Sequence, residues 1–281
     1  MYKIVEKRVL NPEVKLMKIE APAVAKKAQP GQFIILRIDE AGERIPLTVA
    51  DYDREGGTVT IIFQEVGATT KRLGQLEAGD SLLNFVGPLG VASHLDGIRR
   101  AVVIGGGLGT AIAYPQAKRL HELGAHVDVI TGFRNQQLVI LEDELKACSD
   151  RLIVMTDDGS NGNKGFVTHA LQKLLDEGNE YDVVIAIGPM MMMKFVCEVT
   201  RPRKIKTIVS MNPIMIDGTG MCGGCRVAVG GETKFACVDG PDFDGHLVDF
   251  DEAIRRSSMY RSEERQSMEQ HGCRLMAQGK E

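Results

Sequence analysis

The sequence lacks an excess of basic residues, long apolar runs and any tryptophan. Lys and Arg number 34 against 38 Asp and Glu, which gives a formal net charge of −4. Because nucleic acids and anionic membrane surfaces favour basic patches, neither is expected as the main partner. Residues 101–117 carry no charge, but four glycines and a proline interrupt them, so they fall short of a membrane span.

The N-terminal stretch also lacks the features of a signal peptide. MYKIVEKRVL carries Glu6 in its charged opening and contains no apolar core. The expected location is therefore the cytoplasm, where disulfide frameworks are rare. Six cysteines in such a chain indicate ligands or buried thiols, and the isolated Cys148, Cys197 and Cys273 are expected to be inert.

What remains is an ordinary globular composition, with 43% apolar and 26% charged residues among 281, which allows two domains. Residues 1–97 predict an antiparallel β-barrel, because short β-rich runs alternate with Gly, Pro and Asp. These runs are KIVEKRVL, VKLMKIEAP, GQFIILRID, RIPLTVADYD, GTVTIIFQEV and DSLLNFVGPLG.

The pattern changes near residue 98. Residues 98–210 alternate short apolar strands, of which RRAVVIGGG is the first, with helical stretches, of which AIAYPQAKRLHELG is the first. This alternation is typical of a doubly wound parallel sheet with helices on both faces. TIVSMNPI, at 207–214, could add one more strand. The predicted fold is therefore a β domain followed by an α/β domain.

A glycine turn, GGGLG at 105–109, follows the first strand of the α/β domain and opens a helix. Such a turn offers backbone N–H groups and a helix N-terminus to a pyrophosphate. It departs from the strict G-x-G-x-x-G pattern, and TGFRN stands where an acidic residue is expected after the second strand. The candidate nucleotide-binding residues of this turn are Gly106, Gly107, Gly109 and Thr110.

Two further strand ends lead to the same carboxyl edge of the sheet, where open α/β sheets bind ligands. One carries Asp157 and Asp158, and the other carries Gly188, Pro189 and Met190. Either aspartate could accept hydrogen bonds from ribose hydroxyls and would repel a 2′-phosphate, which favours NAD(H) over NADP(H). The alternative is that these acids only cap the next turn.

Two turns of the β domain carry candidate contacts to a flavin and its phosphates. RIPLT, at 44–48, offers a cation and a hydroxyl, and VGATT, at 66–70, offers a glycine turn with two hydroxyls. Either turn alone is also compatible with plain turn chemistry. The candidate residues are Arg44, Pro46, Leu47, Thr48, Val66, Gly67, Thr69 and Thr70.

The run IDGTGMCGGC places Asp217, Cys222 and Cys225 in a D-x4-C-x2-C spacing, and Cys237 follows. Plant-type [2Fe–2S] centres use C-x4-C-x2-C with a fourth cysteine further on. These four residues are therefore expected to hold a [2Fe–2S] cluster, with an aspartate in the first position. Structural zinc and inert thiols are the alternatives, and His246 is the nearest histidine that could serve zinc.

The β domain, the GGGLG sheet domain and the cysteine run together resemble the ferredoxin–NADP reductase superfamily. The stretch NPIMIDGTGMCGGCRVAVGGETKFACVDGPDFDGHLVDFDEA resembles the electron-transfer subunits of dihydroorotate dehydrogenase. It is more similar still to the small (alpha) subunits of NADH-dependent reduced ferredoxin:NADP oxidoreductase, which are also known as sulfide dehydrogenase subunits.

This resemblance implies FAD on residues 1–97, NAD(H) on residues 98–210 and a [2Fe–2S] cluster on residues 211–248. It implies an oxidoreductase subunit that passes electrons between these cofactors, and it nominates no catalytic side chain. A larger flavin and iron–sulfur partner subunit would form a heterodimer with it and carry out electron bifurcation between NADP(H) and ferredoxin. Residues 249–281 form a polar tail that is expected either to contact a partner or to be a solvated end. A dihydroorotate or sulfide dehydrogenase subunit and a zinc-bound scaffold subunit are the alternatives.

Overall fold

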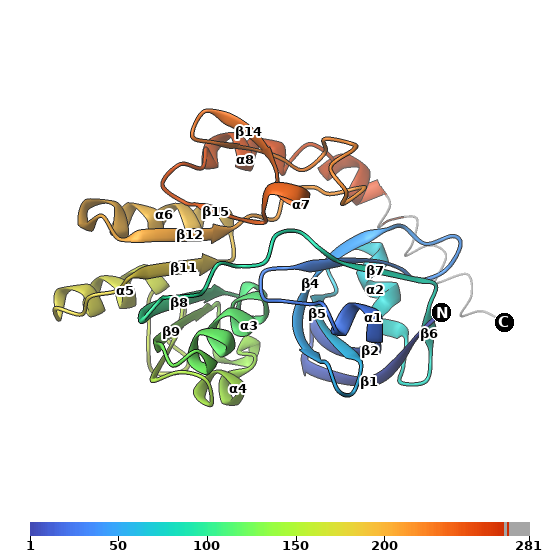
Figure 1. Ribbon diagram of the computed structural model, residues 1–281, viewed down its shortest axis with the longest axis horizontal. Coiled ribbons are helices and arrows are strands. Elements are labelled where there is room, and N and C mark those ends of the chain that lie inside the picture. The colour runs from blue at the N-terminus through green and yellow to red at the C-terminus, as the bar shows by residue number, and fades with distance from the viewer. Residues whose placement is uncertain (267–268, 270–281) are drawn as a thin grey trace.

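The computed structural model describes residues 1–266 and 269 of the chain. Within these residues, a seven-stranded sheet, a six-stranded sheet and a two-stranded hairpin account for the strands. The two large sheets lie side by side, and the C-terminal segment lies along the top of both (Figure 1). Cys273 and most of the last stretch of the predicted partner-contacting tail fall outside the described residues.

The N-terminal sheet has the order β6-β1-β2-β5-β4-β3-β7, and all its neighbouring strands are antiparallel. It curls around a core that includes Ile4, Met17 and Phe63, none of which is exposed (Figure 1). The predicted antiparallel β domain is therefore confirmed. Its strands are β1 (Tyr2–Asn11), β2 (Val14–Glu20), β3 (Phe33–Arg37), β4 (Ile45–Asp53), β5 (Thr58–Gln64), β6 (Ser81–Leu82) and β7 (Asn84–Leu89).

Two helices in this domain do not follow from the sequence pattern. They are α1 (Pro22–Ala25) and α2 (Ala68–Gln75). The sequence of α2 contains two threonines and a glycine, all weak helix formers, so VGATT indicated only a turn. The helix begins because Thr70 Oγ1 accepts a hydrogen bond from Gly67 N at 3.0 Å and closes the first turn.

The second sheet has the order β10-β9-β8-β11-β12-β15. Its first five strands are parallel, and β15 pairs antiparallel with β12 at the edge. The predicted doubly wound sheet is confirmed, as is the further strand expected in TIVSMNPI, which is β12. The strands are β8 (Arg100–Gly106), β9 (His126–Phe133), β10 (Arg151–Thr156), β11 (Val183–Ile187), β12 (Lys206–Ser210) and β15 (Asp242–Asp244).

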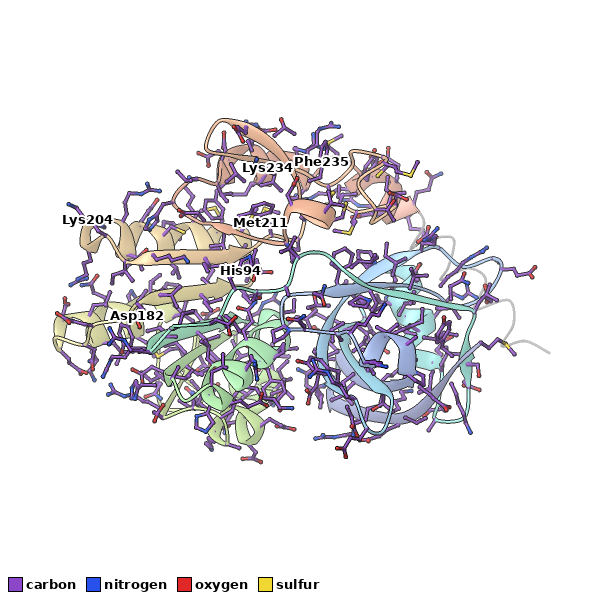
Figure 2. The ribbon with its side chains drawn as sticks, viewed as in Figure 1. His94, Asp182, Lys204, Met211, Lys234 and Phe235 are labelled. Carbon is purple, nitrogen blue, oxygen red and sulfur yellow. The ribbon has the colours of Figure 1, made fainter. Side chains whose placement is uncertain are left out.

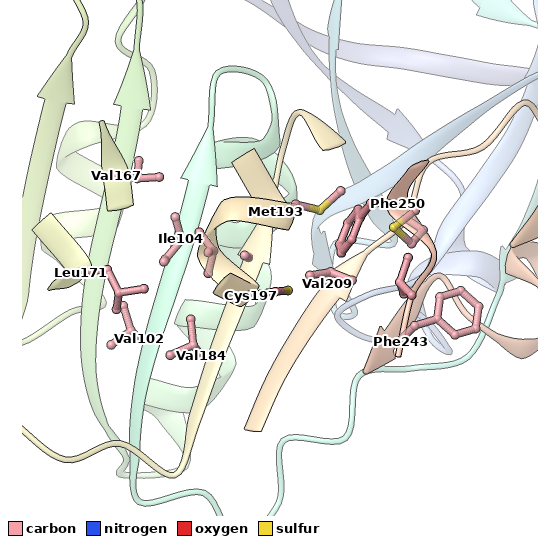
Figure 3. Close-up of a cluster of buried hydrophobic side chains, with 14 of the residues drawn as sticks. Val102, Ile104, Val167, Leu171, Val184, Met193, Cys197, Val209, Phe243 and Phe250 are labelled. Carbon is pink, nitrogen blue, oxygen red and sulfur yellow. The ribbon is translucent and has the colours of Figure 1, made fainter. Parts of the chain in front are cut away.

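Helices cover both faces of this sheet. One face packs against α3 (Gly109–Glu122) and α4 (Glu142–Lys146), and the other against α5 (Val167–Asp176) and α6 (Met190–Thr200). Two short 3-10 turns, η1 (Gln136–Leu138) and η2 (Arg201–Arg203), follow β9 and α6. Ile104 of β8, Met193 of α6 and Phe250 share the core on the face covered by α5 and α6 (Figure 3). This core therefore continues into the C-terminal segment.

The C-terminal segment folds around a small hairpin. It contains β13 (Arg226–Val229), β14 (Glu232–Phe235), α7 (Ala236–Asp239) and α8 (Phe250–Arg256), with β15 between the two helices. Gly230 and Gly231 join the hairpin strands with φ of 61° and 82°, and such a two-residue turn needs residues that tolerate positive φ. Among the described residues, no helix combines the length and apolarity that crossing a membrane requires.

A polar network closes the amino edge of the parallel sheet. Tyr181 donates a hydrogen bond from its hydroxyl to Asp128, whose side chain is completely buried in β9. His126 and Arg151 lie 3.3 and 3.6 Å from the same carboxylate. Burial, followed by the hydrogen bond to Asp128, raises the pKa of Tyr181 well above its usual value. The carboxyl edge, where the nucleotide-binding candidates lie, is thus opposite an amino edge that this network holds together.

Replacing Tyr181 with Phe should lower the free energy of unfolding by about 1–3 kcal/mol, because a buried charged acceptor loses a donor. Tyr52→Phe is the matched control, since Tyr52 is half-buried and its ring lies beside Arg54. The control should change stability by less than about 0.5 kcal/mol. Urea denaturation of the two variants measures the difference, and equal midpoints would contradict the role of the Tyr181 hydroxyl.

Candidate cofactor and cluster site

The loop between β12 and β13 carries the first three cluster candidates. Gly218, Gly220 and Gly223 have φ of 81°, 87° and 65°, a conformation that other residues rarely adopt. These glycines wind the chain tightly, so backbone N–H groups turn toward the side chains of the loop. The loop ends at Cys225, the residue immediately before β13.

Cys225 and Cys237 form one pair. Arg226 pairs with Phe235 at the base of the hairpin, and Ala236 N donates to Cys225 O at 3.1 Å. Both cysteines are 2% exposed. Burial, and then the neighbouring thiol of Cys225, raises the pKa of Cys237 to about 11, while the N–H of Gly220 lowers it. The hairpin therefore brings two distant thiols into contact.

Asp217 and Cys222 form a second pair on the exposed side of the loop. Asp217 Oδ2 accepts hydrogen bonds from Thr219 Oγ1 at 2.5 Å and Thr219 N at 3.0 Å, which lower its pKa. Cys222 Sγ accepts from Gly224 N at 3.4 Å. The N–H groups of Gly224 and Asp217 lower the pKa of Cys222. Both side chains are thus biased toward the anionic forms that bind metal.

These two pairs fit a binuclear cluster, since four protein ligands shared between two irons approach as two and two. A single tetrahedral zinc would need its ligands to converge on one point. In residues 1–266 and 269, no group of three or more His, Cys, Asp or Glu side chains is arranged to hold one metal ion. His246 instead has its ring Nε2 3.0 Å from Thr200 Oγ1.

The other described cysteines are buried in the cores on the two faces of the parallel sheet. Cys148 Sγ donates to Leu145 O of α4 at 3.6 Å, and Cys197 is a buried residue of α6. Burial is the main reason that the pKa is raised to about 11 for Cys148 and about 12 for Cys197. Thiols that remain protonated in apolar surroundings are unreactive and poor ligands.

The cluster loop packs directly on the β domain. A Cβ atom at Gly218 would lie 2.5 Å from Ile35 Cδ1 of β3 and 3.4 Å from Leu89 Cδ1 of β7. Arg44, immediately before β4, is close enough for its charge to lower the pKa of Asp217. The structure therefore brings this flavin candidate beside the first cluster candidate, which the sequence alone did not indicate.

The remaining flavin candidates lie on β4 and at the start of α2. Pro46, Leu47 and Thr48 pair with Ile35, Ile34 and Phe33 of β3, and all three candidates are half-buried. The other candidates are Val66, which is exposed, Gly67 and Thr70, which close the first turn of α2, and Thr69, whose hydroxyl donates to Glu43 at 2.8 Å. The first amides of α2 have no partner within the helix, which suits an anion.

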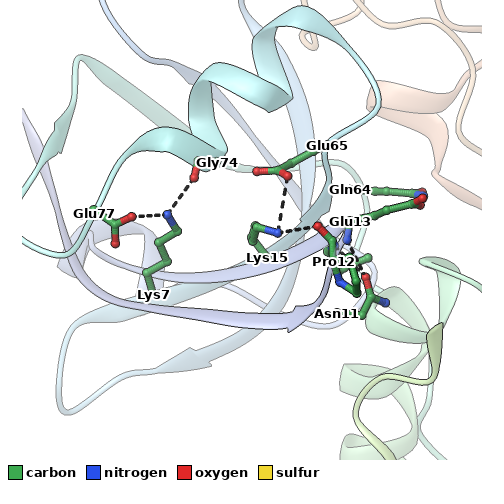
Figure 4. A network of polar contacts seen from close by, with 10 residues as sticks. Lys7, Asn11, Pro12, Glu13, Lys15, Gln64, Glu65, Gly74 and Glu77 are labelled. Atoms are coloured by element: carbon green, nitrogen blue, oxygen red, sulfur yellow. Dashed lines mark hydrogen bonds and ion pairs between the residues drawn. The ribbon is translucent and has the colours of Figure 1, made fainter. Parts of the chain in front are cut away.

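Two lysines with largely buried side chains, Lys7 of β1 and Lys15 of β2, support α2 (Figure 4). Lys7 Nζ donates to Gly74 O at 2.7 Å near the end of the helix and to Glu77 at 2.6 Å. Lys15 Nζ lies 3.5 Å from Glu65, whose side chain covers Gly74 so closely that a Cβ there would meet it at 1.7 Å. A cation at the C-terminal end of a helix is favourable, so these contacts fix the direction of α2.

Packing explains two of the glycines in the nucleotide turn. A Cβ at Gly109 would lie 2.3 Å from Ile187 O, and one at Gly106 would lie 2.5 Å from Met192 Sδ. These glycines let the turn after β8 touch the turn at 188–190, which starts α6. Gly107, with φ of 54° and no atom near its missing Cβ, instead faces open space. Thr110 is completely buried behind this turn.

The two aspartates after β10 differ in their surroundings. Asp158 accepts from Ser160 N at 2.9 Å, and Ser160 is the main cause of its lowered pKa, so this carboxylate caps its own turn. Asp157 is exposed, and its backbone N donates to Phe133 O at 3.0 Å. Asp157 is therefore the better placed of the two to meet a ribose. Arg134, in TGFRN, lies at the same edge, since its carbonyl oxygen accepts a hydrogen bond from Asp158 N at 3.3 Å.

Comparison with known proteins agrees with this arrangement. Residues 212–249 match the family model for the iron–sulfur cluster binding domain of dihydroorotate dehydrogenase B. A protein in the adh 3′ region of Clostridium beijerinckii is 54% identical over 272 residues, which cover 94% of this chain and 92% of that protein.

Two further comparisons name electron-transfer proteins. The dihydroorotate dehydrogenase B (NAD(+)) electron transfer subunit homolog of Thermotoga maritima is 48% identical, over 89% of this chain and 88% of that protein. A chain in a structure of the NADH-dependent reduced ferredoxin-NADP oxidoreductase, solved for insight into flavin-based electron bifurcation, is 45% identical. It superposes with a TM-score of 0.91 and covers 96% of this chain and 97% of that chain.

Exchanging Asp217 for Cys restores the C-x4-C-x2-C spacing, so we expect iron to be retained. A carboxylate is a harder donor than a thiolate, so the midpoint potential should shift when the ligand changes. EPR-monitored redox titration after reduction with dithionite measures the shift. If this variant were indistinguishable from the wild type while Cys273→Ala lost its iron, Cys273 would be the fourth ligand and not Asp217.

Replacing Cys222, Cys225 or Cys237 with Ala should remove a thiolate ligand and reduce the content of iron and acid-labile sulfide. Cys148→Ala is the matched control, because this buried thiol lies in a different core, and it should leave the iron content unchanged. Elemental analysis of anaerobically purified protein measures both. Equal iron in all four variants would contradict the assignment of the three thiols.

Proposed function

Because the chain belongs to the family of dihydroorotate dehydrogenase B electron-transfer subunits and their homologues, we propose that it passes electrons between NAD(H), FAD and a [2Fe–2S] cluster. The observation that carries this proposal is the arrangement of the four candidate ligands in two pairs. Three of them lie on a loop that packs against β3 and β7, and the fourth, Cys237, lies in α7. When bound, flavin and cluster together supply the conversion of a two-electron hydride into single electrons.

The residues of the chain have binding and positioning roles in this proposal. The first turn of α2 and the residues of β4 hold FAD, and Lys7 and Lys15 keep α2 in place. The turn at 105–109, the turn at 188–190 and Asp157 hold NAD(H) at the carboxyl edge of the sheet. Asp217, Cys222, Cys225 and Cys237 hold the cluster. No side chain is assigned as a general acid or base.

The finer proposal is that the chain is the small subunit of an electron-bifurcating NADH-dependent reduced ferredoxin:NADP oxidoreductase. The close structural similarity to a chain of that enzyme supports it. The larger partner subunit would hold the second flavin and react with NADP(H) and ferredoxin. A dihydroorotate dehydrogenase electron-transfer subunit is the second candidate, and the names of the relatives favour it. Asp217 favours the first candidate, because four cysteines are expected in the second.

Exposed apolar side chains beside the ligands suggest where that partner docks. Ile216, Met221 and Val238 are 57%, 87% and 43% exposed, and each is adjacent in sequence to a cluster ligand. Apolar side chains gathered on a surface are typical of interaction sites. A partner that covers them would bring its own cofactor close to the cluster and exclude water from the ligands.

The purified chain should contain one FAD and about two irons with acid-labile sulfide, as a [2Fe–2S] centre requires. Anaerobic addition of NADH should bleach the flavin absorbance near its visible maximum. Colourless protein with stoichiometric zinc would contradict the proposal, as would flavin that NADH fails to reduce.

NADH should reduce the flavin at lower concentrations than NADPH, because Asp157 repels a 2′-phosphate. This repulsion should cost on the order of 1–2 kcal/mol, or roughly tenfold in affinity. Asp157→Asn should narrow the preference, and Asp158→Asn is the matched control, since Asn can still accept from Ser160 and keep the turn. Titration of flavin reduction with NADH and with NADPH measures the preference in each protein. An unchanged preference in Asp157→Asn would remove Asp157 from the nucleotide site.

A further inference from the structure

Asp242 of β15 lies where the β domain, the nucleotide sheet and the cluster segment meet. Its Oδ2 atom accepts a hydrogen bond from Ser93 Oγ at 2.6 Å and from Gln116 Nε2 at 3.2 Å. Ser93 belongs to the connection between β7 and β8, and Gln116 is a completely buried residue of α3. The side chain of Ser210, at the end of β12, is close enough to the carboxyl group to lower its pKa. One side chain thus joins three elements that lie far apart in sequence.

The β domain approaches the same point through Gly31. A Cβ atom at Gly31 would lie 2.2 Å from Ser93 Oγ and 3.3 Å from Asp242 Oδ2, so no larger side chain fits there. Ser93 N also donates to Pro30 O at 2.9 Å, which ties the connection to the β domain. The carboxylate of Asp242 is therefore in van der Waals reach of all three parts of the molecule.

Backbone hydrogen bonds surround this point. Val91 N donates to Gly240 O at 2.7 Å, and Met211 N donates to Pro241 O at 2.9 Å. Met211 and His94, both labelled in Figure 2, lie in the middle of the molecule between the two large sheets and the upper segment. The segment that carries Cys237 is thus tied to both neighbours within two residues of Asp242.

A carboxyl group is energetically unfavourable at this buried junction. Part of the residue is accessible, but its Oδ1 atom is buried and has no hydrogen-bond partner within the described residues. Burial raises the pKa of Asp242, while its hydrogen bonds and the nearby His94 lower it. A buried carboxyl oxygen without a partner is unfavourable, whereas one oxygen that accepts from two donors fixes their relative positions.

We propose that Asp242 is a positioning residue that holds the cluster segment in register with the β domain and the nucleotide sheet, and thereby sets the separation of flavin and cluster. It acts through Ser93 and Gln116 and touches neither candidate cofactor site. This inference rests on the proposed function for its effect on electron transfer. Its effect on the positions of the three parts is independent of that function.

The test compares Asp242→Ala with Asp242→Asn and with the control Asp244→Ala, an exposed acid on the same strand. Flavin reduction by NADH should be equal in all four proteins. Subsequent reduction of the cluster, followed by stopped-flow absorbance, should slow several-fold in Asp242→Ala, because the rate of electron transfer falls steeply as the distance between the two cofactors grows. Asp242→Asn should restore the rate, since its amide can donate to Gln116 Oε1, an atom without a partner in the described part of the chain.

Hydrogen exchange on the same proteins gives the second readout, with and without cofactors. The amides of Val91, Ser93 and Met211 should exchange faster in Asp242→Ala, whereas those of β8 and β5 should not change. If Asp242→Ala fails to fold, Ser93→Ala combined with Gln116→Leu removes two donors and should give the same two changes.

The inference would be overturned if Asp242→Ala, or the double variant, reduced its cluster and exchanged the three amide hydrogens at the wild-type rates. So would an Asp242→Asn variant as slow as Asp242→Ala in both readouts. A wild-type protein without flavin or cluster would refute the proposed function instead, and the exchange of the three amides would still decide the positioning role.

Discussion

The pairing of β15 with β12 is the interaction on which the rest of the arrangement depends. The cluster segment contributes only a short hairpin and two small helices, too little to bury a core of its own. The segment instead shares the core of the parallel sheet, because β15 pairs with the edge strand β12. The three antiparallel residue pairs are Ile208 with Asp244, Val209 with Phe243 and Ser210 with Asp242. Phe243 and Phe250 then enter the core beside Val209 (Figure 3). The glycine-rich cluster loop is thus supported by the parallel sheet through this edge strand.

The same pairing also decides the order of the candidate sites. The cluster loop leaves β12 at the carboxyl edge of the parallel sheet and reaches the β domain, where Gly218 packs on Ile35. Arg44, at the start of β4, lies within electrostatic reach of Asp217. The cluster loop therefore contacts the domain that carries the candidate flavin strand. In the proposed function, a hydride donor, a flavin and a one-electron carrier would follow one another in that order.

Much of the fold follows from local patterns. The alternation of short apolar strands with helices predicts the parallel sheet, and the D-x4-C-x2-C run identifies the cluster candidates. The resemblance to the ferredoxin–NADP reductase superfamily and to these electron-transfer subunits is confirmed by the comparisons. The helix α2 was missed, because two threonines and a glycine disfavour a helix that depends on the Thr70 cap and on Lys7 and Lys15 from distant strands. Such long-range contacts leave no periodic trace in the sequence.

The role of β15 and of Asp242 was also beyond sequence reasoning. DFD is three residues long and carries two acids, so nothing marks it as the edge of a parallel sheet. Its place depends on Ser93 and Gln116, which lie 149 and 126 residues away in the chain. Similarly, Arg44 looked like a flavin contact alone until the fold brought it beside Asp217. Residues of this kind acquire their roles only when separate domains meet.

The most direct test of electron transfer through this chain is EPR spectroscopy of the anaerobic protein, frozen after addition of NADH alone. If electrons pass from NADH through the flavin to the cluster, a reduced [2Fe–2S] signal should appear, with the same line shape that dithionite produces. Flavin that is fully bleached by NADH beside a cluster that stays EPR-silent, yet is reduced by dithionite at a potential accessible to NADH, would contradict the account.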